Sequence, residues 1–173
     1  MAKTCLNKLP SNFLTTCDLP IHGVKNIYLM HTGDVTVTLT TDATISSAVF
    51  AEGTRAYRVE GYKQNIQITA AARTLGASNK LDVSVMFKIK PNAFAGLNSI
   101  LTSRFYVLVV YNDASLPSQF LGYVSPLECS AIDYDSNANG MYVTVTLTAP
   151  DGSAGNYLTP ASNTVRDAII SKA

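Results

Sequence analysis

Apolar residues fall on every second position in two stretches of this chain, residues 81–90 and residues 140–148. Successive side chains of a β-strand point to opposite faces, so this alternation predicts two strands that each bury one face. In the second strand, Tyr142 and three threonines occupy the outward positions. The residues expected to face the core are Leu81, Val83, Val85, Phe87 and Ile89 in the first strand and Met141, Val143, Val145 and Leu147 in the second.

Residues 105–111, Phe-Tyr-Val-Leu-Val-Val-Tyr, are apolar at both parities and rich in β-branched and aromatic side chains. This composition is typical of a strand that is covered on both faces, and we place it at the centre of the fold. Before it, Pro91 ends the preceding strand, and residues 94–101 have apolar positions at helical spacing, which predicts a short helix. After it, a polar loop and residues 119–125 predict a return strand that forms a hairpin with the central one.

Four more segments have the composition of strands, and we expect them to form two hairpins. Residues 23–31 and 35–40 are separated by the turn Thr-Gly-Asp, and residues 55–60 and 65–70 by a short connection. The charged residues of the second pair indicate a hairpin that projects from the body. Residues 42–50 are predicted as a loop that contains at most a short strand.

The remaining segments are shorter or less regular. Residues 71–79 are small and polar and predict a mobile loop, whereas residues 127–134 predict one more strand. Residues 164–170 suffice for about two helical turns, which is too short for a helix that stands alone in water. This helix is therefore expected to be either frayed or docked onto another surface.

Together these elements predict one domain, residues 22–150, that is mainly β: an antiparallel β-sandwich or partly open barrel with one flanking short α-helix. Residues 1–21 contain two prolines and no regular pattern, so they predict an extended N-terminal arm that lies on a neighbouring subunit or on its own domain. Residues 151–173 begin with turn-forming residues and are expected to form an extended C-terminal arm.

The surface is predicted to carry few charges, because only 14% of the 173 residues are charged. A typical soluble domain has roughly 25%, and charges are depleted at the centres of protein interfaces, so we expect neighbouring proteins to cover much of this surface. The net charge of +1 and the lack of basic clusters argue against a duplex-binding surface. No apolar run approaches the roughly 20 residues that cross a bilayer, and the first residues lack the apolar core of a secretion signal, so we expect a protein made in a cytoplasm.

Cysteine and histidine provide only a weak candidate for a metal site. Cys5, Cys17 and Cys129 are widely spaced and contain no C-x-x-C pair, so reduced thiols are expected rather than a disulfide framework. Cys17 together with His22 and His31 would supply three ligands, but histidines on a loop and at a strand end are more often plain polar residues. We predict no metal and no cofactor.

Residues 133–140, Asp-Tyr-Asp-Ser-Asn-Ala-Asn-Gly, have the alternating oxygen ligands of a calcium loop. The match fails at Ala138, where that loop needs a glycine, and at Thr144, where it needs a bidentate glutamate. A type I′ turn at Asn139 and Gly140 explains the same residues as a connection between two strands, and we prefer this interpretation.

Catalytic or sugar-binding chemistry has equally modest support in the sequence. Glu128, Asp133 and Asp135 are the only candidates for a catalytic carboxylate pair, as in a hydrolase, but acidic residues near a surface turn are usually just solvated. The chain has nine tyrosines, whose rings are able to stack on sugars, but four of them fall in predicted strands where packing is the simpler explanation. These four are Tyr57, Tyr106, Tyr111 and Tyr142. We therefore predict no catalytic residues and a protein that is not an enzyme.

The order of the central elements resembles the tail-tube and connector-ring proteins of tailed bacteriophages, particularly crAss-like and other Bacteroidetes-infecting phages. The resemblance covers roughly residues 17–150, and it depends on the order strand, short helix, strand, loop and last strand. The matching segments are Cys17 to Leu29, Arg104 to Tyr111, Phe120 to Tyr123 and Gly140 to Thr148. It implies a tail-tube-like sandwich arranged as a ring of six or twelve copies around a DNA channel, with residues 55–70 as the nearest candidate for a hairpin that lines the lumen.

What this resemblance implies for function is a virion structural protein of the tail tube or the head–tail connector. Its expected partners are copies of itself, adjacent portal, ring or tail proteins, and genomic DNA that passes through without sequence-specific binding. No membrane and no small-molecule substrate is expected, and the protein would be assembled in the host cytoplasm. The alternatives are a carbohydrate-binding or host-attachment β-sandwich module and a capsid decoration protein.

Overall fold

The computed structural model describes residues 23–41, 43–61, 65–72, 81–90, 94–134, 142–150, 155–156 and 158–173. The N-terminal arm predicted for residues 1–21 lies outside these ranges. So does the loop predicted for residues 71–79, except for its first two residues, which belong to a strand.

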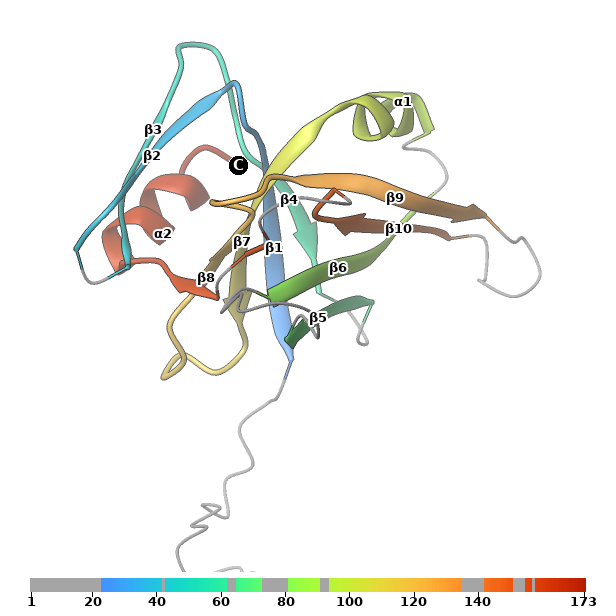
Figure 1. Ribbon diagram of the computed structural model, residues 1–173. Helices are drawn as coiled ribbons and strands as arrows, with labels where there is room; N and C mark the ends of the chain where they lie inside the picture. Colours follow the sequence, from blue (N-terminus) through green and yellow to red (C-terminus); the bar gives the residue numbers. More distant parts are fainter. Residues whose placement is uncertain are drawn as a thin grey trace, which may run out of the picture.

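The described residues form a mainly β, antiparallel protein with two short helices, as Figure 1 shows. The predicted strands at 81–90, 105–111, 127–134 and 140–148 and the helix at 94–101 are confirmed with small changes of their ends. The strands are β1 Val24–His31, β2 Val35–Leu39, β3 Ile45–Phe50, β4 Tyr57–Glu60, β5 Ile66–Ala72, β6 Leu81–Ile89, β7 Arg104–Tyr111, β8 Gln119–Leu121, β9 Leu127–Tyr134, β10 Val143–Thr148 and β11 Thr159–Pro160, and the helices are α1 Phe94–Thr102 and α2 Asn163–Ile170.

β7 is the strand at which the large sheet branches, in agreement with its predicted central position. One edge of β7 pairs with β1, which in turn pairs with β4. The other edge pairs with β9 near Phe105 and with β8 from Val107 onward. Between these two partners the chain bends at Gly122, which has a φ of +88°, and an added Cβ would lie 2.9 Å from the carbonyl oxygen of Phe105. From β9 the sheet continues through β10 and β6 to β5, and from β8 to β11.

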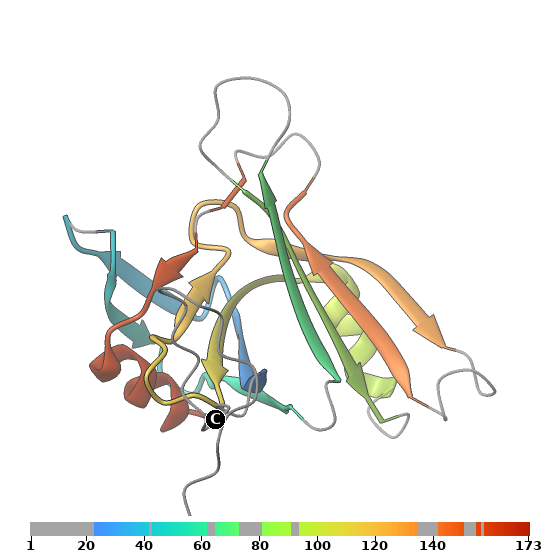
Figure 2. The same cartoon turned by 90° about the horizontal axis from the view of Figure 1, so that it is seen from below.

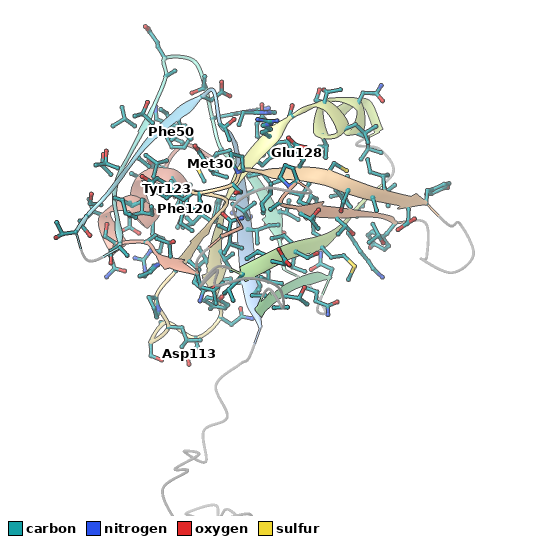
Figure 3. All side chains as sticks on the ribbon, in the orientation of Figure 1. Met30, Phe50, Asp113, Phe120, Tyr123 and Glu128 are labelled. Atoms are coloured by element: carbon teal, nitrogen blue, oxygen red, sulfur yellow. The ribbon has the colours of Figure 1, made fainter. Side chains whose placement is uncertain are left out.

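Two apolar clusters lie on opposite faces of β1 and β7. The first cluster contains Val107 and Val109 of β7 together with the inward residues of β6 and β10, which confirms their predicted alternation. The second cluster contains Leu108 and is covered by β2, β3 and α2. Figures 1 and 2 show these covering elements on one side of β7, and β5, β6, β9, β10 and α1 on the other. Figure 3 labels four residues of the second cluster: Met30, Phe50, Phe120 and Tyr123.

The outward face of β10 is less exposed than the alternation predicts. Thr144 is buried, whereas Tyr142, just before the strand, is exposed as expected. The strand lies between β6 and β9, so side chains of both neighbours flank its threonines. Met141 lies outside the described residues.

The hairpin predicted from residues 23–31 and 35–40 is wrong. β1 belongs to the large sheet, and β2 instead pairs with β3, which occupies most of the segment predicted as a loop at 42–50. The physical reason is visible in β1, where Tyr28 and Met30 are buried as well as Ile27. A strand buried on both faces is favoured beside strands that other parts of the protein also cover. β2 is short and rich in threonine, so it does not provide such a neighbour.

The hairpin predicted from residues 55–60 and 65–70 is also wrong, and with it the candidate for a hairpin that lines a lumen. β4 pairs with β1, and β5 pairs with β6. Gly61 follows β4 directly, and a Cβ at this position would lie 2.1 Å from the carbonyl oxygen of Val24. The chain therefore stays close against β1 at this point and does not turn back on β4.

The C-terminal residues 158–173 are not an extended arm, which corrects that prediction. β11 pairs with β8, and α2 buries Val165 and Ile169 in the second apolar cluster. Lys172 accepts a hydrogen bond from the amide of Ala56 through its carbonyl oxygen, at 3.0 Å. The alternative of a docked helix is thus confirmed, because a helix of eight residues is stable only when packing supports it.

Replacing Ser162 with alanine is expected to lower the free energy of unfolding by about 1 kcal/mol. Ser162 is the N-cap of α2, and its hydroxyl oxygen accepts a hydrogen bond from the amide of Val165 at 3.3 Å. Urea denaturation followed by circular dichroism measures the change. Thr164→Ala, at an exposed position of the same helix, is the control and should not destabilise the protein. An equal loss in both variants would contradict the capping role.

Candidate functional site

No metal site is formed by the part of the chain that the structure describes, where no group of three histidine, cysteine or acidic side chains comes together. Cys5, Cys17 and His22 lie outside that part. Cys129 is half-buried, and its thiol donates a hydrogen bond to the carbonyl oxygen of Ala131 at 3.6 Å. Burial raises the pKa of the Cys129 thiol, and the backbone hydrogen bond opposes this only partly. His31 instead lines an apolar pocket described below.

Of the calcium-loop residues, Asp133 and Tyr134 are described, and they lie at the end of β9. Asp133 and Thr144 are direct cross-strand neighbours, so the segment between them connects two antiparallel strands. This pairing agrees with the preferred interpretation of a strand connection. The turn at Asn139 and Gly140 itself lies outside the described residues, as does Ala138.

The structure does not bring Glu128 and Asp133 together as a carboxylate pair. They are five residues apart on β9, which corresponds to roughly 16 Å along an extended strand, beyond the separation used by paired glycosidase carboxylates. Glu128 forms an ion pair with Arg104 of β7 at 2.5 Å, and Asp133 is exposed. Asp135 lies outside the described residues.

The four tyrosines considered for sugar stacking have different environments. Tyr106 and Tyr111 are partly buried on β7, and burial raises the pKa of both phenols, with the neighbouring Tyr123 adding to the shift at Tyr106. The Tyr111 hydroxyl donates a hydrogen bond to Oε1 of Gln119 at 2.7 Å. Tyr142 is exposed beside β10, and only Tyr57 of the four lines the apolar pocket.

This pocket is a mostly apolar concave site in the described part of the chain. It lies where β1 and β6 end, where β4 and β7 begin, and beside α1, with a volume of about 350 Å³. Each of these elements contributes at least one side chain because their ends converge around the first apolar cluster. The lining residues are Leu29, His31, Tyr57, Val59, Phe87, Ile89, Ser99, Ile100 and Phe105.

Three rings form one corner of the pocket. The His31 ring lies 4.8 Å from that of Phe105 and 5.7 Å from that of Tyr57, edge to face in the second case. The guanidinium carbon of Arg55 lies 5.1 Å from the centre of the Tyr57 ring, a cation–π contact. These contacts hold the rings in place and put one positive charge next to the pocket.

The lining determines what the pocket is able to bind. Its walls are mostly aliphatic and aromatic, and its polar groups are the His31 imidazole, the Tyr57 hydroxyl and the Ser99 hydroxyl. Apolar walls with a few polar groups favour an apolar group with one polar or anionic neighbour. None of the nine described lining residues is a carboxylate or a thiol.

Sequence reasoning missed this pocket for a definable reason. The alternation of β6 identifies Phe87 and Ile89 as inward residues, but it does not show that the end of this strand leaves a space. The space depends on how α1 lies against the sheet, which is a tertiary arrangement. In the sequence, His31 is interpreted as a plain polar residue in preference to a metal ligand, and no pattern distinguishes Ser99.

Two open strand edges, one in the large sheet and one in the two-stranded β2–β3 sheet, are the second feature with functional potential. Among the described strands, β5 pairs only with β6, and β2 pairs only with β3. Neither β5, Ile-Gln-Ile-Thr-Ala-Ala-Ala, nor β2, Val-Thr-Val-Thr-Leu, contains a charge or a proline. Monomeric proteins usually protect sheet edges with charges, prolines or bulges. The register of β5 is regular throughout and that of β2 shifts only between Thr38 and Leu39, so these two edges are open to pairing with another chain.

Comparison with protein-family models, with curated proteins and with solved structures gives no significant match for this chain. None of the helices in the described ranges has the length and apolar character needed to span a membrane.

Proposed function

We propose that this protein is a virion structural subunit that assembles into a ring of identical copies in the tail tube or head–tail connector of a phage, with a tail-tube-like sandwich as its body. The observation that carries the proposal is the uncharged edge of β5. Seven consecutive residues without a charge or a proline end the large sheet, and Gln67, Thr69, Ala70 and Ala71 are exposed. Such an edge favours pairing with a strand of a neighbouring copy.

The backbone of β5 shows which peptide groups are available for pairing. The amide of Lys88 on the β6 side donates to the carbonyl oxygen of Asn65, at 3.1 Å. In an antiparallel pair the residues alternate in direction, so the amides and carbonyls of Ile66, Ile68 and Ala70 point away from β6. Ile66 is buried and Ile68 is half-buried, and both line a hollow with Val24 and Tyr111 of the same chain, whereas Ala70 is exposed. The groups of Ala70 are therefore in position to bond a strand of another copy, for which the uncharged β2 is a suitable partner. Pairing of one edge with a different edge joins copies head to tail, which closes a ring when the rotation permits.

The docked C-terminal helix limits which parts of the chain are able to contact a neighbouring copy. Because α2 covers the second apolar cluster of its own chain, residues 158–173 are not free to cross to an adjacent ring. Contacts between copies then come from the strand edges, from loops and from the N-terminal arm, which remains an expectation. The near-neutral net charge of +1 suits a channel through which DNA slides, since few phosphates would be neutralised.

Ala70→Pro is expected to abolish ring formation while the fold is retained. Proline removes the outward amide of Ala70 and leaves the ladder between β5 and β6 intact, because that amide does not face β6. Negative-stain electron microscopy and native mass spectrometry of the full chain would show closed rings for the wild type and for Ala70→Ser, and monomers for Ala70→Pro. Circular dichroism checks that the three proteins fold alike. A wild type that stays monomeric at all concentrations would refute the proposed function.

A carbohydrate-binding or host-attachment module is the second candidate, and the position of Tyr57 favours it. Tyr57 is 41% exposed and borders the apolar pocket. An exposed aromatic face beside a pocket is able to stack on a sugar. A glycan array distinguishes the candidates: a specific sugar bound by the wild type but not by Tyr57→Ala, without ring formation, would favour this one.

A further inference from the structure

The loop between β7 and β8 presents a leucine at its tip. Leu116 is 50% exposed, although it is a large apolar side chain. The loop around it is held in one shape, because Oδ1 of Asp113 accepts hydrogen bonds from the amide of Ser115 at 2.8 Å and from its hydroxyl at 2.6 Å. The amide of Leu116 donates to the carbonyl oxygen of Asp113 at 3.2 Å, and Pro117 follows. A fixed, exposed leucine loses little conformational freedom when another protein buries it.

The apolar pocket lies at the opposite end of the same strand. Phe105, the second residue of β7, lines the pocket, and the strand ends at Tyr111, directly before the loop. Its eight residues span roughly 25 Å, so the loop does not reach the pocket of its own chain. Figure 3 shows the separation, with Asp113 in the loop at one end and Glu128, which pairs with Arg104 at the start of β7, at the other.

The loop and the pocket match in chemistry and in charge. The pocket offers an apolar volume of about 350 Å³ with the guanidinium of Arg55 at its aromatic corner. The loop offers an apolar side chain with the carboxylate of Asp113 three residues before it. Among the described residues Arg55 forms no ion pair, whereas Arg58 pairs with Glu60 and Arg104 with Glu128. Arg55 is thus the cation that is available to an incoming carboxylate.

We propose that the pocket receives Leu116 of a second copy of this chain, with Asp113 of that copy near Arg55. This inference deepens the proposed function, on which it rests, because it names a contact between copies that is separate from the pairing of sheet edges. The contact joins unlike surfaces at the two ends of β7, so it links copies head to tail. Where the rotation between copies does not close a ring, the contact repeats along the direction of that strand. In an assembly of rings it joins a copy in one ring to a copy in the next.

Two variants on different sides of the contact test the proposal. Leu116→Asp places a charge at the tip of the loop, and Ser99→Trp fills the pocket from α1 without touching the loop. Both positions are exposed, so both variants should fold. The controls are Leu116→Met, which keeps an apolar tip, and Ser99→Ala. Both test variants should weaken head-to-tail association of the full chain at least about tenfold in sedimentation velocity, and the controls should not.

A photocrosslinker gives the position of the contact directly. With p-benzoylphenylalanine at position 116 in a mixture of ¹⁵N-labelled and unlabelled chains, mass spectrometry should find cross-links between chains to residues 57–59 or 99–105. Cross-links confined to one chain, or to surfaces away from the pocket, would overturn the inference.

The outcomes separate this inference from the proposed function. If wild-type rings form and Leu116→Asp leaves their stacking unchanged, this inference fails and the ring proposal stands. If no ring forms but the wild type still makes head-to-tail pairs that Leu116→Asp abolishes, the ring proposal fails and the contact stands. A small-molecule ligand that occupies the pocket of a strictly monomeric wild type would overturn both.

Discussion

Replacing Val109 with aspartate is expected to prevent soluble expression of the folded protein, with a loss of free energy of unfolding of about 4 kcal/mol or more. Val109 is fully buried in the first apolar cluster, on the strand that pairs with β1 and with β8. A carboxylate there has no cation beside it in the cluster and must be either desolvated or protonated. Because β7 pairs with strands of both branches of the sheet, its disruption would destabilise both apolar clusters.

The experiment compares the soluble fraction and the circular dichroism of Val109→Asp with those of the wild type. Val49→Asp is the matched control, since Val49 is also a strand valine but is 62% exposed, and its loss should stay within about 0.5 kcal/mol. A Val109→Asp protein that is soluble, folded and able to assemble would show that β7 is not the centre of the fold.

The sequence predicts most strands of this fold, because the period of a strand is a local property. Val83, Val85 and Phe87 occupy every second position, and all three are buried. The composition of β7 also indicates its position: apolar residues on both faces require cover on both faces, and Val107 and Leu108 belong to different clusters. These predictions needed only the geometry of an extended chain.

The pairing of strands could not be predicted in the same way. Residues 23–31 and 35–40 are close in sequence and joined by turn formers, which favours a hairpin, yet β2 pairs with β3. The choice depends on which pairing buries both faces of β1, and this involves β7, roughly 80 residues further along the chain. The serines of β3 favour a loop when only the sequence is considered, although Ile45 is fully buried in the structure.

The candidate pocket escaped prediction for a related reason. His31, Tyr57 and Phe105 are far apart in sequence, and only the pairing of β1 with both β4 and β7 brings them together. The sequence identifies the loop at Leu116 as a polar turn with one leucine. The fixed shape of this loop, however, depends on the hydrogen bonds of Asp113. Local patterns therefore identify the elements, whereas the site requires knowledge of the tertiary contacts.

Asn156 is the residue whose role differs most from its sequence interpretation. It lies in a stretch of turn-forming residues that we expected to end the sheet, yet it is 1% exposed. Its side chain donates to the carbonyl oxygen of Ser125 at 2.9 Å and accepts from the amide of Ser125 at 3.1 Å. Its backbone forms two more hydrogen bonds with Leu81. One asparagine thus connects the start of β6 with the bend between β8 and β9.

Asn156→Ala is expected to lower the free energy of unfolding by about 2–4 kcal/mol, measured by urea denaturation. The loss is large because Ser125 is itself buried, so its amide and carbonyl would remain without partners and away from water. Asn98→Ala, at an exposed position of α1, is the control and should change stability by less than about 0.5 kcal/mol.

Asn156→Asp separates the two hydrogen bonds of this side chain. The carboxylate still accepts from the amide of Ser125, but when ionised it has no hydrogen to donate to the carbonyl oxygen, and the buried charge adds a further cost. Lowering the pH protonates the group and restores a donor, so this variant should gain stability relative to the wild type as the pH falls toward 4. A variant whose stability difference from the wild type does not change with pH would show that the bond to the carbonyl oxygen of Ser125 contributes little.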